Sequence, residues 1–128
     1  MALAQLSPEA LGHIADYFRT LAEPTRLRVL HTLGEGELPV REIASRVHSS
    51  MANVSRHLTQ LARGGLVQRE SRGNCAYYRI SDPVVHELCD LVCRSLVQRY
   101  ERNLHEQTVR MPPDAEKSLQ ETETPRAA

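Results

Sequence analysis

The chain has no excess charge of either sign, no long apolar run and few cysteines. Its 128 residues contain 16 basic and 16 acidic side chains, so the total charge predicts nothing about a nucleic-acid partner. No stretch approaches the roughly 20 apolar residues of a membrane span, and the N-terminus lacks the basic segment and apolar run of a secretory signal. We therefore expect a cytoplasmic protein with one folded domain and no membrane partner.

Structural disulfides and catalytic motifs are also missing. The three cysteines, Cys75, Cys89 and Cys93, are odd in number, and a cytoplasmic location gives them no reason to form structural disulfides. Ser55 and His57 lie close together on a predicted helix, without an oxyanion loop or a strained nucleophile turn, and no glycine-rich phosphate loop is present. The sequence therefore predicts a protein that is not an enzyme.

Two short helices with apolar faces are predicted between residues 40 and 63. Their apolar positions follow the i, i+3, i+4, i+7 spacing of a helix, with a similar pattern in each. These positions are Val40, Ile43, Ala44 and Val47 in the first helix and Val54, Leu58, Leu61 and Ala62 in the second. His48, Ser49 and Ser50 form the turn between them, and either serine can cap the second helix.

A glycine pair and a hairpin follow the second helix. Gly64 and Gly65 end the helix, because glycine adopts the left-handed conformation of a helix C-terminus without steric cost. Residues 66–67 and 77–80 are expected to be the apolar and aromatic ends of two strands, with a turn at residues 71–74 between them. The predicted fold is a homodimeric winged helix-turn-helix, mainly α with a small β-hairpin, in which the second helix enters a DNA major groove and Arg69 and Arg72 lie on the wing.

The outward positions of that second helix suit DNA recognition. They carry hydrogen-bonding side chains with almost no acid among them, and their lengths reach base edges and phosphates. These positions are Ser50, Met51, Asn53, Ser55, Arg56, Thr59 and Gln60. Between residues 41 and 79 the chain has seven arginines and only two glutamates, a local net charge of +5. His57 is expected to pack against the protein or to contact a phosphate.

Three further helices and a tail complete the predicted organisation. Helix start signals at Ser7-Pro8, Glu23-Pro24 and Asp82-Pro83 open helices that run to about residues 21, 33 and 104. The last of these is apolar over more than one face, which predicts a homodimer bound to a pseudo-palindromic operator in double-stranded DNA. We expect residues 1–105 to form the DNA-binding and dimerisation domain and residues 106–128 to form a disordered acidic tail.

Four blocks in this order resemble the ArsR/SmtB family of bacterial winged-helix repressors over roughly residues 10–100. The blocks are LAEPTRLRVLHTL, VREIASRV, VSRHLTQLARGGLV and SRGNCAYYRI. The resemblance implies a homodimer that uses its first and last helices as the interface and leaves its operator when a metal, metalloid or oxidant acts on it. It also implies that Ser50, Met51, Ala52, Asn53, Ser55 and Arg56 face DNA, with Arg72 on the wing.

The sensor sites of that family do not carry over. The Cys-Val-Cys motif of the arsenic and cadmium sensors corresponds here to residues 38–41, which contain no thiol. The family's zinc-type site on the last helix uses an Asp, a His two residues later and two further ligands; here Asp82 is followed by Val84, and Ser95 and Gln98 stand at the later positions. The second-helix cysteine of the family's dithiol sensors corresponds to His31. The sequence therefore does not identify the inducer.

A stripe of possible ligands remains on the last helix. His86, Cys89, Asp90 and Cys93 follow the spacing of one helix side, and soft thiolates bind thiophilic ions such as As(III), Cd or Zn. Cys75, or a cysteine of the second subunit, is a candidate third ligand. Two other interpretations stand beside a metal site: the thiols are oxidised as a redox or reactive-sulfur sensor, or Cys89 packs as a small apolar residue. A winged-helix module that binds protein is the remaining alternative to a repressor.

Overall fold

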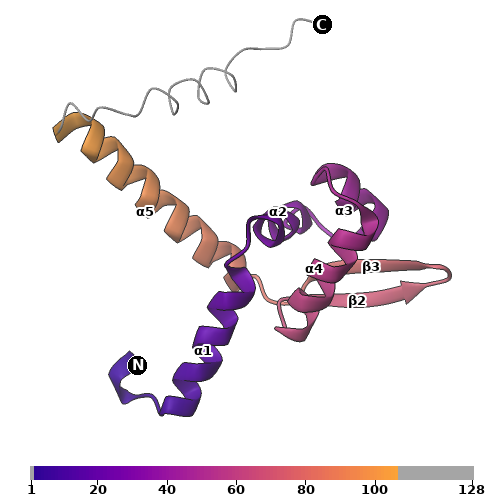
Figure 1. The fold of residues 1–128 in the computed structure, drawn as a ribbon, viewed down its shortest axis with the longest axis horizontal. Coiled ribbons are helices and arrows are strands. Elements are labelled where there is room, and N and C mark those ends of the chain that lie inside the picture. Colours follow the sequence, from indigo (N-terminus) through magenta and orange to yellow (C-terminus); the bar gives the residue numbers. More distant parts are fainter. Residues whose placement is uncertain (1, 107–128) are drawn as a thin grey trace, which may run out of the picture. The chain divides into compact units, whose positions relative to one another are not determined.

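The computed structural model describes residues 2–106 of the chain (Figure 1). In chain order the elements are η1 (Leu3–Gln5), α1 (Pro8–Leu21), α2 (Pro24–Leu33), β1 (Leu38–Pro39), α3 (Val40–Arg46), α4 (Met51–Arg63), β2 (Val67–Arg72), β3 (Cys75–Ile80) and α5 (Val84–Glu106). The chain divides into two units at a boundary within α5, between Cys89 and Asp90. The first unit contains the helix-turn-helix and the sheet.

Three helices begin where the sequence predicts, because a side chain accepts a backbone N–H at the start of each. Ser7 Oγ accepts the Ala10 N–H at 3.1 Å at the start of α1. Glu23 Oε2 accepts the Arg26 N–H at 2.8 Å at the start of α2, and Asp82 Oδ1 accepts the Val84 N–H at 3.0 Å before α5. These bonds satisfy backbone donors that have no partner inside their own helices.

The core of the first unit is formed by the predicted apolar faces. Ile43 on α3 and Val54, Leu58 and Leu61 on α4 are fully buried, together with Val29 on α2. The buried cluster consists of Leu21, Val29, Leu30, Leu33, Ile43, Ala44, Val47, Val54, Leu58, Leu61, Leu66, Val67, Tyr78 and Val85. Because α2, α3 and the hairpin all contribute to this cluster, α4 is held firmly along its apolar side.

The sheet has three strands, not the two that the sequence predicts. Its order is β1-β3-β2 and both pairings are antiparallel. Leu38 and Pro39 of β1 pair with Tyr78 and Tyr77. The predicted four-residue turn is wrong: Arg72 pairs with Cys75, so the turn between β2 and β3 is Gly73-Asn74. Gly73 has φ 61°, which only glycine adopts without strain.

The described residues of the second unit are the part of α5 that begins at Asp90. Its large apolar side chains are about half exposed in the single chain. They are Leu91, Val92, Leu96, Val97, Tyr100 and Leu104. No helix among residues 2–106 is both long enough and apolar enough to span a bilayer. The acidic tail predicted for residues 106–128 lies almost entirely outside the described part of the chain.

Candidate nucleic-acid interface

Helix α4 presents the side chains that the sequence predicts for DNA recognition. Ser50 is its N-cap, and Ser50 Oγ accepts the Asn53 N–H at 3.1 Å. Of the predicted DNA-facing residues on this element, five are exposed: Ser50, Met51, Ala52, Arg56 and Gln60. Asn53, Ser55 and His57 are partly buried. The outer side of α4 is therefore accessible while its inner side is fixed in the core.

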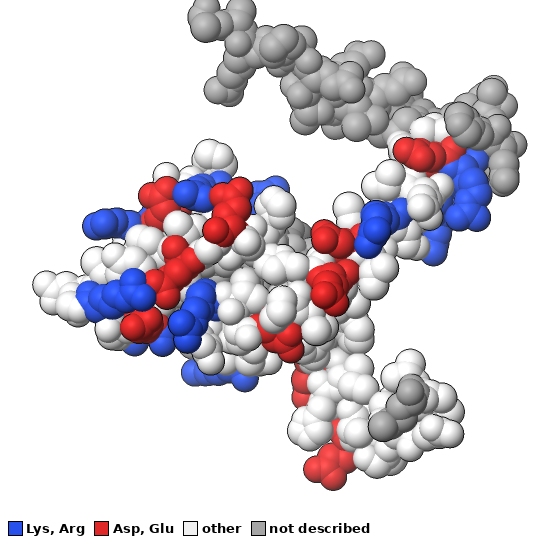
Figure 2. Space-filling view, turned by 180° about the vertical axis from the view of Figure 1, so that it is seen from behind, with Lys and Arg blue, Asp and Glu red and all other residues white. Residues whose placement is uncertain are grey.

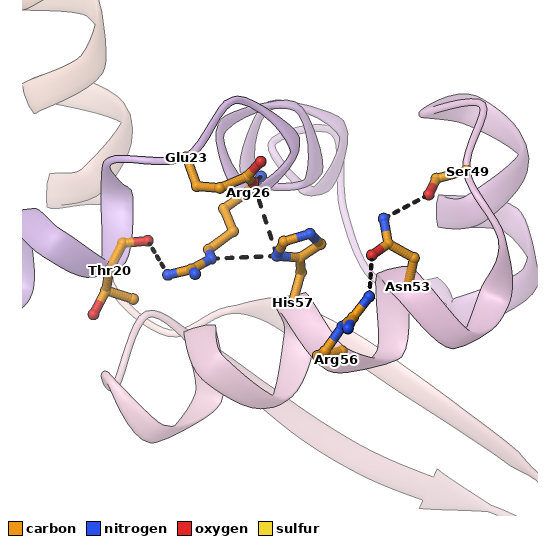
Figure 3. Close-up of polar contacts among 7 residues, drawn as sticks. All are labelled: Thr20, Glu23, Arg26, Ser49, Asn53, Arg56 and His57. Atoms are coloured by element: carbon orange, nitrogen blue, oxygen red, sulfur yellow. Dashed lines mark hydrogen bonds and ion pairs between the residues drawn. The ribbon is translucent and has the colours of Figure 1, made fainter.

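Asn53 and Arg56 are joined in a chain of hydrogen bonds (Figure 3). Asn53 Nδ2 donates to Ser49 Oγ at 2.9 Å, and Arg56 Nη2 donates to Asn53 Oδ1 at 2.7 Å. The contact with Arg56 fixes which side of the amide carries the oxygen, because a guanidinium can only donate, whereas the Ser49 hydroxyl can donate or accept. The Arg56 guanidinium is thereby held beside the amide at the start of the helix.

His57 points toward α2, not along the direction taken by Arg56 (Figure 3). Arg26 Nε donates to His57 Nδ1 at 3.3 Å, and Glu23 Oε2 lies 3.8 Å from the same nitrogen. The same Arg26 donates through Nη1 to the Thr20 carbonyl at 3.2 Å. This network ties the middle of α4 to the junction of α1 and α2, which favours the packing interpretation of His57.

The two wing arginines lie on opposite faces of the sheet, because successive strand residues point to opposite sides. Arg69 pairs with Tyr78, whose side chain is buried, and Arg69 Nη1 donates to Ser71 Oγ at 2.9 Å. Arg72 pairs with Cys75 on the other face. Gly65, with φ 77°, makes the left-handed turn that leads from α4 into this hairpin.

Arg72 is surrounded by three partners. Its Nη2 lies 2.6 Å from Glu37 Oε1 and 3.0 Å from Glu70 Oε2, and its guanidinium carbon lies 4.7 Å from the centre of the Tyr77 ring. The hydrogen bond with Glu70, followed by the charge of Glu37, raises the pKa of Arg72. The guanidinium is therefore charged, and Glu37, Glu70 and the Tyr77 ring already contact it on the wing.

Ion pairs reduce the local positive charge that the sequence suggests. Glu35 and Glu37 precede the arginine-rich segment and pair with Arg46 at 3.3 Å and Arg72 at 2.6 Å. Figure 2 shows acidic and basic side chains interspersed on the face of the winged unit that it presents. Within residues 2–106, five arginines of this segment make no ion pair: Arg41, Arg56, Arg63, Arg69 and Arg79.

The predicted sensor residues do not gather around one point. The described residues contain no group of three or more His, Cys, Asp or Glu side chains that could hold a metal ion. His86 contacts Gly34 closely enough that a Cβ there would lie 2.9 Å from His86 Cε1, and Cys89 packs against the buried core. Cys93 is exposed on α5, and Cys75 is partly buried on β3.

Sequence reasoning missed the residues that position the predicted DNA contacts. Glu37 pairs with Arg72, and Arg26 donates to His57. The partners in each pair are about 30 residues or more apart in the sequence, so no local pattern reveals them. The sequence offers either Ser49 or Ser50 as the helix cap; Ser50 fills that role, and Ser49 instead binds the Asn53 amide. The pair of serines in the turn is the sequence feature that could have indicated both the helix cap and the partner of the Asn53 amide.

Comparison with known proteins identifies related sequences. A "Helix-turn-helix domain" family matches residues 21–70. The HTH-type transcriptional regulator KmtR of Mycobacterium tuberculosis is 35% identical over 75 residues, which span 59% of this chain and 58% of that relative. The uncharacterised regulator Rv0081 of the same species is 37% identical over 86 residues, 66% of this chain and 75% of the relative. The arsenic resistance transcriptional regulator ArsR1 of Pseudomonas putida is 32% identical over 95 residues, 73% of each.

Solved structures share the fold. The crystal structure of Mycobacterium tuberculosis Rv0081 matches with a TM-score of 0.68 and 31% identity, covering 77% of this chain and 99% of that one. The solution structure of the homodimeric winged helix-turn-helix domain Mb0332 of Mycobacterium bovis, described as a possible ArsR-family transcriptional regulator, matches with a TM-score of 0.64 and 30% identity. It covers 82% of this chain and 98% of the other.

Proposed function

The chain belongs to the ArsR/SmtB family of winged helix-turn-helix regulators, and from this premise we propose that it is a sequence-specific DNA-binding transcriptional repressor. The observation that carries the proposal is the outer side of α4. It is capped by Ser50, carries no carboxylate between Ser50 and Gln60, and is followed by an arginine-bearing wing. An element of this kind fits a major groove, with Asn53 and Arg56 positioned for base edges and phosphates.

The repressor acts as a homodimer in this proposal. The Mb0332 domain, to which this chain is similar, is homodimeric. In the single chain, Phe18 on α1 and Leu96 on α5 are half exposed, like the other large apolar residues of α5. A two-fold dimer places its two recognition helices in successive major grooves, about 34–36 Å apart, on a pseudo-palindromic operator.

We further propose that the inducer acts on thiols of α5. Exposed Cys93 is accessible to a thiol-directed reagent, and modification of Cys89 would disturb its packing on the buried core. The similarity to the arsenic resistance regulator ArsR1 supports a thiophilic inducer. A complete metal site does not fit the described residues of one chain, so a metal or metalloid would need ligands from the second subunit, whereas oxidation needs none.

The test of DNA binding uses fluorescence anisotropy with a labelled duplex from the region upstream of the protein's own gene, alongside a random duplex. We expect tighter binding to the upstream duplex and a steep loss of affinity with salt. Arg56→Ala should weaken binding to both duplexes and reduce the salt slope by about one unit for each lost phosphate contact. A protein that binds neither duplex would contradict the repressor and favour a protein-interaction module.

The same assay tests the inducer when the bound, reduced protein is titrated separately with As(III), Cd(II), Zn(II), peroxide and persulfide. Release by one of these agents that is lost in Cys93→Ser or Cys89→Ser, but kept in Cys75→Ser, is the expected result. Release by oxidants alone would identify redox sensing. Specific binding that none of the agents changes would show that these cysteines are packing residues.

A further inference from the structure

The side chain of Arg72 extends across the whole sheet. Arg72 lies on β2, Tyr77 on the central strand β3, and Glu37 immediately before the edge strand β1. Its contacts with Glu37 at 2.6 Å and with the Tyr77 ring at 4.7 Å therefore connect the tip of the wing to the opposite edge. Glu70 on β2 holds the same guanidinium at 3.0 Å. A side chain bound at three places restrains the hairpin relative to β1.

Arg69, unlike Arg72, makes few contacts with the rest of the protein. It lies on the other face of the hairpin, is exposed, and makes one hydrogen bond, to Ser71 Oγ at 2.9 Å. No carboxylate among residues 2–106 pairs with it. A phosphate can therefore bind Arg69 at the expense of a single hydroxyl contact.

We propose that the two wing arginines have different roles: Arg69 contacts a DNA phosphate, and Arg72 is a positioning residue that holds the wing in place through Glu37. The proposal rests on the DNA-binding function above. Moving Arg72 to a phosphate would leave Glu37, whose side chain is only 23% exposed, without its cation beside an approaching polyanion. Moving Arg69 to a phosphate leaves no carboxylate of residues 2–106 without its cation.

The salt dependence of binding separates the two roles, because its slope counts the phosphates neutralised in the complex. Arg69→Gln should weaken binding to every duplex and reduce the slope by about 0.9 for each wing in contact. Arg72→Gln should weaken binding about fivefold, as expected for the loss of two partly exposed ion pairs and one cation–π contact, and leave the slope unchanged. A fall in slope for Arg72→Gln equal to that for Arg69→Gln would overturn the proposal.

Glu37→Gln gives an independent test in which the two roles predict opposite signs. If Arg72 positions the wing, this variant should weaken binding in spite of its lost negative charge, and adding it to Arg72→Gln should cause no further loss. If Glu37 instead withholds Arg72 from DNA, Glu37→Gln should tighten binding and steepen the slope, which would overturn the proposal. Glu35→Gln is the matched control. It removes the same charge from the same loop, but Glu35 pairs with Arg46 and not with Arg72.

Two further measurements keep the outcomes distinct. Circular dichroism melting of each variant, as full-length chain, verifies that its fold is intact. Failure of the unmodified protein to bind DNA would count against the proposed function as a whole. Specific binding by the unmodified protein, combined with a lowered slope in Arg72→Gln, would reject only the division of roles between Arg69 and Arg72.

Discussion

At the scale of single residues, Asn53 is constrained by its neighbours before any DNA is present. One N–H of its amide is bound to Ser49 Oγ and one lone pair of its carbonyl is bound to Arg56. A side-chain amide has a second N–H and a second lone pair. Asn53 can therefore still meet a base edge, in an orientation that Arg56 selects and Ser49 helps to hold.

This arrangement predicts a graded loss of base preference. Asn53→Ala should reduce discrimination between operator and random DNA by about 1–3 kcal/mol, the value of a good amide–base contact. Ser49→Ala should reduce it less, because the amide is then present and held by Arg56 alone. Competition anisotropy with operator and random duplexes measures both effects.

Thr32→Ala is a suitable control for these variants. Thr32 lies on α2, outside the residues predicted to face DNA, and its hydroxyl donates to the Arg28 carbonyl at 2.8 Å. We expect this variant to retain base preference. Equal loss of affinity for operator and random DNA in Asn53→Ala would contradict a base-reading role for Asn53.

At the scale of elements, the N-terminus of α2 is the point at which three helices are connected. Glu23 caps α2 through the Arg26 N–H, while the Arg26 side chain joins the last turn of α1 to His57 on α4. The backbone hydrogen bond from Arg26 is the main cause that lowers the pKa of Glu23. The charged form of Glu23 is thus the one that stabilises the fold.

The direction of that shift predicts a pH dependence. Because the pKa of Glu23 is lower in the folded than in the unfolded chain, its stabilising effect is complete above the unfolded value and is lost as the pH falls through the folded value. Glu23→Gln should therefore lower the thermal unfolding midpoint at neutral pH and change it little in acid. Melting curves from neutral pH down to about pH 3 measure the difference from the unmodified protein.

Glu9→Gln provides the comparison for this element. Glu9 lies in the first turn of α1 but is not its capping residue, since Ser7 fills that role. We expect its melting curves to follow those of the unmodified protein more closely than those of Glu23→Gln. Identical pH profiles for the two variants would show that Glu23 does not act as a charged cap.

At the scale of the whole molecule, the exposed apolar side chains of α5 form the surface that the proposed dimer buries. Leu96 is 55% exposed and Val97 is 50% exposed in the single chain. Exposed apolar patches of this kind mark interaction surfaces. In the proposed dimer each such residue is buried twice, once in each subunit.

Leu96→Glu should dissociate the dimer. The substitution places an unpaired carboxylate in both halves of the interface, at a cost of about 3 kcal/mol or more. Sedimentation velocity should show monomers, and operator affinity should fall with the lost second half-site. Ser95→Glu adds the same charge at the neighbouring exposed position and should remain dimeric. A dimer that persists in Leu96→Glu would place the interface elsewhere.

The local elements of this protein follow from its sequence. Ser7 caps α1 as predicted, Ser50 is the one of two candidate serines that caps α4, and α2 begins at the predicted Glu23-Pro24. Gly65 makes the predicted left-handed turn, because caps and turns depend on residues within four positions of each other. The apolar spacing on α3 and α4 likewise predicted their buried faces, since helical periodicity is a local property.

Only the tertiary structure decided which long-range partners meet. The short strand β1 and the contacts of Arg72 with Glu37 and of Arg26 with His57 depend on pairing between distant segments. Strand register and ion pairing are set by the packing of the whole sheet and core, so no local pattern encodes them. For this reason the sequence by itself determined a recognition helix followed by a wing, whereas the folded chain decided that Glu37 and Glu70 hold Arg72 while no carboxylate of residues 2–106 pairs with Arg69.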